Sequence, residues 1–115
     1  MKPNIIKEKS FDFAINIVNL YKDLAHNKKE FVMSRQLLKS GTSIGANVRE
    51  AEFAQSKKDF INKMSISLKE ANETDYWLDL LHATNYINTK DFGKFKPKSQ
   101  EMLRLLVSIV KTSKE

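Results

Sequence analysis

Apolar residues recur every three or four positions through most of this chain, and this spacing constrains its fold more than any other feature. Between residues 10 and 27, for example, Phe13, Ile17, Leu20 and Leu24 share one face of a helix. No segment alternates apolar and polar residues for long enough to predict a strand. Only two prolines and three glycines interrupt the 115 residues, which favours a few long helices.

The pattern predicts four amphipathic helices within a single domain over residues 1–115, and their approximate ranges are 10–27, 30–54, 56–83 and 90–111. Ser10, Ser56 and Thr89 are expected to cap three of them at the N-terminus. Pro97 is expected to kink or split the last helix. Four helices of similar length with short connections indicate an all-α, antiparallel up-down-up-down bundle.

The segment SGTSIGANVREA contains two of the three glycines. It lacks the lysine that directly follows the last glycine of a phosphate-binding loop, and the apolar helical period continues through it. We therefore interpret it as the middle of a helix. Gly41 and Gly45, four residues apart, would let another backbone approach closely, either within the bundle or between subunits.

Three polar residues of this segment, Ser43, Asn47 and Glu50, follow one another at helical spacing. We expect them to hydrogen-bond to a neighbouring helix and to set its register. A solvated helix edge is the alternative interpretation.

The third predicted helix has a second apolar face besides the one that would face the core. This face comprises Ile66, Trp77, Leu80 and Leu81, and it is bordered by Glu70 and Glu73. A monomer would expose it as an apolar patch, so we expect a subunit interface. The alternative is a broad bundle stripe in which Trp77 covers the end of the bundle.

The net charge of +6 is unevenly distributed. Residues 28–69 carry nine basic and four acidic side chains, residues 70–91 carry one and five, and residues 92–115 carry six and two. Such blocks suit either a polyanion or the pairing of a positive face with a negative one. The candidates for phosphate contact are Arg35, Lys39, Arg49, Lys57, Lys58, Lys63, Lys94, Lys96, Lys98 and Arg104. Ordinary solvated helix faces are the alternative.

Catalytic and metal chemistry find little support in the sequence. The chain has no cysteine, which excludes disulfides and thiolate chemistry. Four-helix di-metal sites use Glu-x-x-His pairs, and neither His26 nor His82 stands at that spacing from a glutamate. We therefore expect no catalytic residue, metal or cofactor. The N-terminus lacks a signal-peptide pattern, so a cytoplasmic location is expected.

The stretches SRQLLKSGTSIGANVREA and KKDFINKMSISLKEANETDYWLDLL resemble the bacterial four-helix-bundle family of 23S rRNA intervening-sequence proteins. The resemblance runs from about residue 10 to 111 and is strongest across 34–81. Where that family often has Glu-Gly, this chain has Glu50-Ala51.

The resemblance implies a homopentameric barrel. It also implies kinship with the accessory variability proteins of diversity-generating retroelements, which are similar pentamers thought to engage nucleic acid and a reverse transcriptase. No catalytic residue can be transferred from the family. We therefore expect a non-enzymatic oligomeric scaffold that binds RNA or DNA through repeated basic surfaces. A protein-interaction scaffold or adaptor with no nucleic-acid role is the alternative.

Overall fold

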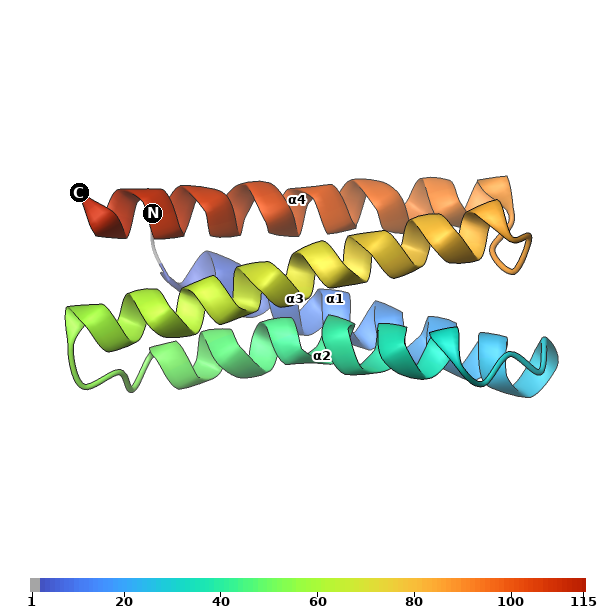
Figure 1. Cartoon of the computed structure of the whole chain (residues 1–115), viewed down its shortest axis with the longest axis horizontal. Coiled ribbons are helices and arrows are strands. Elements are labelled where there is room, and N and C mark those ends of the chain that lie inside the picture. The colour runs from blue at the N-terminus through green and yellow to red at the C-terminus, as the bar shows by residue number, and fades with distance from the viewer. Residues whose placement is uncertain (1–2) are drawn as a thin grey trace.

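A computed structural model describes residues 3–115 as four α-helices and one π-helical turn. α1 (Pro3–Lys22) continues directly into the π-helical turn η1 (Asp23–Asn27). α2 (Met33–Ala51), α3 (Lys57–Ala83) and α4 (Thr89–Lys114) follow, and the described range contains no strand. The helices lie along the long axis of a molecule of 44 × 20 × 19 Å, and their connections lie at alternate ends (Figure 1).

The core is one continuous cluster to which all four helices contribute apolar side chains. It includes Ile6, Phe13 and Ile17 of α1, Leu37, Ile44 and Val48 of α2, Met64, Ala71 and Leu78 of α3, and Met102, Leu106 and Ile109 of α4. Their spacing is the three-and-four repeat expected from the sequence. The expected all-helical class is therefore confirmed.

Two of the three expected N-caps are wrong. α1 begins at Pro3, and Ser10 lies fully buried inside it, where its hydroxyl donates to the Lys7 carbonyl at 3.2 Å. Proline is common in the first turn of a helix. Its missing N–H costs nothing there, because the N–H groups of the first turn have no acceptor within the helix. α4 is capped by Asn88 rather than by Thr89, because the Asn88 side chain accepts from the Asp91 N–H at 2.8 Å.

The cap at Ser56 is confirmed, since its hydroxyl accepts from the Asp59 N–H at 3.0 Å. Asp59 in turn accepts from the N–H of Gln55 at 3.2 Å. This reciprocal pair satisfies two backbone donors at the start of α3.

α2 begins at Met33 rather than at residue 30, because the Glu30 carboxylate itself covers the N-terminus of the helix. Its oxygens accept from the backbone N–H groups of Val32 at 3.0 Å, Met33 at 3.1 Å and Ser34 at 2.7 Å. The Ser34 hydroxyl donates back to the Glu30 carbonyl at 2.7 Å. A buried carboxylate is tolerated here because backbone donors and the helix dipole both favour its negative charge.

α4 runs without a break through Pro97, so the expected split of this helix is wrong (Figure 1). Proline removes the hydrogen bond to the carbonyl four residues earlier, which belongs here to Gly93. Both residues are exposed, so water can satisfy that carbonyl.

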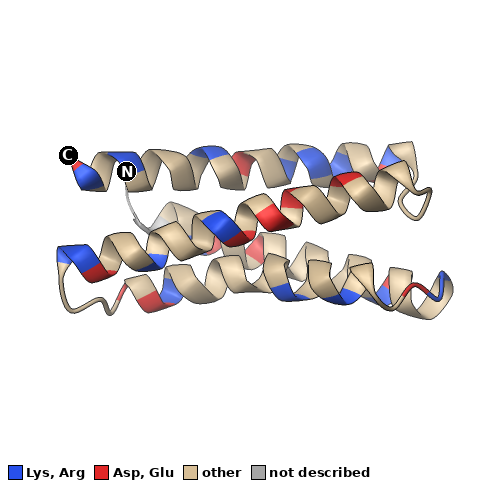
Figure 2. Ribbon diagram, viewed as in Figure 1, with Lys and Arg blue, Asp and Glu red and all other residues tan. Residues whose placement is uncertain are grey.

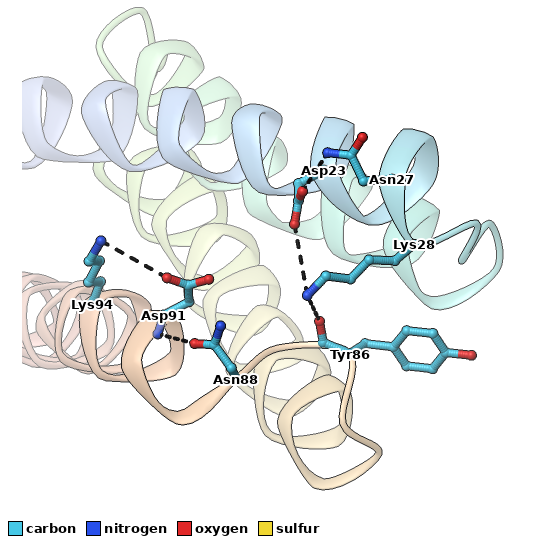
Figure 3. A network of polar contacts seen from close by, with 7 residues as sticks. All are labelled: Asp23, Asn27, Lys28, Tyr86, Asn88, Asp91 and Lys94. Atoms are coloured by element: carbon cyan, nitrogen blue, oxygen red, sulfur yellow. Dashed lines mark hydrogen bonds and ion pairs between the residues drawn. The ribbon is translucent and has the colours of Figure 1, made fainter.

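At one end of the bundle, the connection after α1 is tied to the connection after α3. The Lys28 ammonium donates to the Tyr86 carbonyl at 2.6 Å and lies 4.0 Å from the Asp23 carboxylate (Figure 3). Asn27 donates to Asp23 at 2.7 Å within the π-helical turn. Lys28 thus links segments 58 residues apart, which fixes how the two halves of the bundle meet.

Candidate functional site

The two glycines of the small-residue segment face α1 within the same subunit. A Cβ on Gly41 would lie 2.7 Å from Ile17 Cγ2, and one on Gly45 would lie 3.3 Å from Ser10 Oγ. Both distances are shorter than ordinary contact between such atoms. The segment is therefore a helix–helix packing site inside the bundle, which was one of the two expected alternatives.

The polar residues beside these glycines do not hold a neighbouring helix as expected. The Ser43 hydroxyl donates to the Lys39 carbonyl at 2.6 Å, and the Asn47 amide donates to the Ser43 carbonyl at 2.9 Å. Both bonds stay within α2, a local pattern that Ser and Asn adopt readily. Only Glu50 crosses to α3, where it accepts from Lys63 at 3.1 Å.

Buried hydroxyls make the α2–α3 contact instead. The Ser67 hydroxyl donates to the Ile44 carbonyl at 2.9 Å, and the hydroxyls of Thr74 and Ser40 lie 2.9 Å apart. All three hydroxyl-bearing side chains are fully buried. The signal for them was present in the sequence, because Ser40, Ser67 and Thr74 occupy core positions of the helical repeat.

An ion-pair cluster joins α3 to α4. The Lys96 ammonium lies 2.7 Å from Asp75 and 2.9 Å from Asp79, and the Ser99 hydroxyl donates to Asp75 at 2.9 Å. Partial burial opposes the charge of Lys96, but its hydrogen bonds to the two carboxylates prevail and raise its pKa. Lys96 is thus a structural cation, although the sequence placed it among the phosphate-binding candidates.

Some of the remaining candidates for phosphate contact interact with another side chain, and the others form no ion pair among the described residues. Lys63 is engaged by Glu50, and the Arg49 guanidinium lies 5.7 Å from the centre of the Phe11 ring. Other candidates are exposed and form no ion pair among the described residues; these are Arg35, Lys39, Lys57, Lys58, Lys98 and Arg104.

One side of α4 is rich in cations, although Glu101, which pairs with Lys9 at 3.1 Å, lies among them. Helical spacing places Lys90, Lys94, Lys98, Arg104 and Lys111 on one side of the helix, and all five are exposed. We call this series the basic row, and Figure 2 shows Lys and Arg along the length of α4. Lys94 approaches Asp91 at 4.0 Å. Lys90 and Lys111 were absent from the sequence-based candidates, although the same helical spacing would have found them.

The expected second apolar face of α3 is partly wrong. Leu81 is fully buried in the bundle core, and Trp77 packs against that core. α3 packs against both α2 and α4, so it buries a wider arc than a single stripe. Ile66 and Leu80 remain partly exposed.

What remains outside the bundle is a narrower surface on α3, which we call the α3 ridge: Ile66, Glu70, Glu73, Tyr76 and Trp77. The Tyr76 and Trp77 rings meet edge to face at 5.0 Å, and the Trp77 indole donates to Glu73 at 3.1 Å. Burial, followed by the nearby Glu73 carboxylate, raises the pKa of Glu70, while Lys39 and Lys69 oppose the shift. The ridge is therefore both aromatic and acidic.

A groove of about 460 Å³ lies between α1 and α2. Phe11 and Phe53 form its apolar sides and are 53% and 80% exposed. Gly45 and Ala46 line the groove. Because their side chains are absent or small, the small-residue segment leaves space for the groove at the surface. We call it the α1/α2 groove, and Arg49 is its cation without an ion pair among the described residues.

Residues 3–115 contain neither a metal-binding cluster nor a membrane-spanning helix. No group of three or more His, Cys, Asp or Glu side chains lies close enough to hold a metal ion. No helix in this range combines the length and apolar character needed to cross a membrane.

Comparisons with known proteins agree with this architecture. Residues 2–108 match the family described as 23S rRNA-intervening sequence protein. A crystal structure from Bacteroides thetaiotaomicron VPI-5482, of a protein with unknown function from the S23 ribosomal protein family, is 59% identical. It superposes with a TM-score of 0.93 and covers 96% of this chain and 99% of that chain. No curated protein matches the chain. The chain therefore belongs to the 23S rRNA-intervening sequence protein family.

Proposed function

We propose that this protein is a non-enzymatic, cytoplasmic scaffold that binds nucleic acid through the basic row of α4. In this proposal the antiparallel up-down-up-down bundle assembles as a homopentamer, as the family resemblance implies. No cofactor takes part.

The basic row is the observation that carries the proposal. It extends over 22 helical residues from Lys90 to Lys111, whose Cα atoms are about 32 Å apart along the helix. This length is close to one turn of a B-form DNA duplex, about 34 Å. Five exposed cations on one side of a helix can contact several phosphates, and such contacts add to the affinity.

The proposed binding is led by charge and shape. Phosphate contacts position a protein on nucleic acid, but they do not read its sequence. A family named for sequences that intervene in 23S rRNA favours RNA over DNA as the partner. Repetition of the row in an oligomer would multiply the phosphate contacts and steepen the dependence of affinity on salt.

The test is RNA and DNA binding by the whole protein across a salt series. The variant to compare carries Lys94→Gln, Lys98→Gln and Arg104→Gln together. Each lost phosphate contact should reduce the slope of log affinity against log salt concentration by about 0.7–0.9.

The control for this test is Lys29→Asn, which removes one exposed charge that does not belong to the row. Lys29 is exposed with a φ of 57°, a conformation that asparagine tolerates. Absence of binding by the wild-type protein at low salt would rule out the proposal. So would equal binding by the triple variant and the control.

A protein-interaction scaffold with no nucleic-acid role is the second candidate. It draws on the exposed apolar α1/α2 groove and on the α3 ridge, which a partner such as a reverse transcriptase could cover. Co-purification of such a partner by a protein that binds neither RNA nor DNA would favour it.

A further inference from the structure

The α1/α2 groove and the α3 ridge are two exposed, partly apolar surfaces that differ in charge. Arg49 lines the groove without an ion pair, beside Lys7 and Glu50, which pair with Glu52 and Lys63, whereas the ridge carries Glu70 and Glu73. Phe11 and Phe53 give the groove its apolar character, and Arg49 gives it a cation. On the ridge, Tyr76 is 57% exposed beside Trp77. Exposed aromatic side chains of this size are uncommon on the surface of a monomer unless they meet a partner.

Arg49 of the groove and both glutamates of the ridge lack an ion pair among the described residues. Neither Glu70 nor Glu73 forms an ion pair within residues 3–115. Burial first and the Glu73 carboxylate second raise the pKa of Glu70, while Lys39 and Lys69 oppose the shift. Arg49 likewise has no carboxylate partner in that range, and its guanidinium is held near the Phe11 ring. A second surface that placed Arg49 beside Glu70 and Glu73 would give the guanidinium and the carboxylates an ion-pair partner.

The two surfaces cannot meet within one molecule. The groove lies between α1 and α2, whereas the ridge lies on the outer side of α3, and the helices are packed rigidly through the core. A second copy of the chain presents the same two surfaces. Because groove and ridge differ, their contact would be heterologous, and it would leave one groove and one ridge open for further copies.

We propose that the α3 ridge of one copy docks into the α1/α2 groove of the next. Arg49 of one copy then faces Glu73 of its neighbour, and Phe11 and Phe53 pack against the Tyr76–Trp77 pair. This inference rests on the homo-oligomer proposed above and adds which faces meet. It also assigns Arg49 to assembly and leaves the basic row of α4 for nucleic acid.

The test uses charge reversal and measures mass in solution by sedimentation. Arg49→Glu and Glu73→Arg should each raise the dissociation constant of the assembly by at least about tenfold, because like charges then meet at the contact. The variant that carries both reversals should recover assembly. Mixing the two single variants should also restore association, since the intact groove of one meets the intact ridge of the other.

Lys98→Glu is the matched control, because it reverses an exposed charge on α4 that belongs to neither surface. It should keep the wild-type mass and bind RNA more weakly than the wild type. A second variant, Phe53→Ser, removes an exposed ring and should weaken assembly without charge reversal. Circular dichroism should show wild-type helix content in every variant, because all substituted residues are exposed.

The outcomes separate this inference from the proposed function. A monomeric wild-type protein would overturn both the homo-oligomer and the docking. An oligomeric wild type whose mass is unchanged by Arg49→Glu or Glu73→Arg would overturn the docking alone. So would a failure of the double reversal to recover assembly. If Phe53→Ser weakened RNA binding but left the mass unchanged, the groove would belong to nucleic acid instead.

Discussion

Gly41 of α2 lies against Ile17 of α1 so closely that there is no room between them for a methyl group. A Cβ at Gly41 would be 2.7 Å from Ile17 Cγ2 and 2.9 Å from Ile17 Cγ1. Ile17 is fully buried and branched at Cβ, so these atoms cannot swing aside. The contact explains why α2 has a glycine rather than a larger residue at position 41.

Gly41→Ala should lower the free energy of unfolding by about 1–2 kcal/mol, because overpacking outweighs the gain in helix propensity. Gly93→Ala is the control, because nothing lies within 4 Å of its Cβ position in α4. That change should raise the free energy of unfolding by about 1 kcal/mol. Urea denaturation measures both, and equal stabilisation by the two changes would contradict the close contact.

Ser67→Ala should destabilise the protein by about 1 kcal/mol, because it removes the buried hydrogen bond from α3 to the Ile44 carbonyl. Ser65→Ala makes the same chemical change two residues earlier, at a partly exposed position with no side-chain hydrogen bond among the described residues. The difference between the two variants isolates the interhelical bond. Thermal unfolding of both, compared with wild type, provides the measurement, and no difference would count against the bond.

Glu30→Ala should cost about 2 kcal/mol, because three backbone N–H groups at the start of α2 lose their acceptor. Glu30→Gln keeps one side-chain oxygen and should cost less. Glu8→Ala, at an exposed site in α1, should change stability by less than about 0.5 kcal/mol. Denaturant titration should give the largest loss of unfolding free energy for Glu30→Ala, a smaller loss for Glu30→Gln and the smallest for Glu8→Ala. A Glu30→Ala protein as stable as Glu8→Ala would refute the capping role.

Lys96→Met should lower the free energy of unfolding by about 1–2 kcal/mol at neutral pH, because Asp75 and Asp79 lose their shared cation. The pKa of Lys96 is raised in the folded protein, so its contribution is complete below the unfolded pKa of about 10.4. That contribution is lost as the pH rises through the folded value.

Wild type should therefore lose stability above about pH 10.4 more steeply than Lys96→Met does. Lys98→Met is the control, because this exposed lysine has no ion pair among the described residues. It should keep the alkaline slope of the wild type. Melting temperatures measured between neutral and alkaline pH test this, and parallel curves for wild type and Lys96→Met would exclude the role of the ion pair.

The helices were predictable because their signal is local. Apolar spacing places Met64, Ala71 and Leu78 on the buried side of α3 whatever packs against them. Helix ends were less predictable, because several residue types can cap a helix and tertiary contacts choose among them. Ser10 has the chemistry of a cap, yet burial of Ile6 extends α1 beyond it.

The candidate surfaces were predictable only in part. The sequence alone determined that the chain is all-helical, where its charge blocks lie and that Gly41 and Gly45 permit close approach, because these follow from residue type and helical period. Tertiary structure decided that the glycines face α1, that Leu81 is core and that Lys96 is engaged by α3. The physical reason is distance along the chain: partners such as Lys28 and Tyr86 stand 58 residues apart, and only the packing of the helices brings them together.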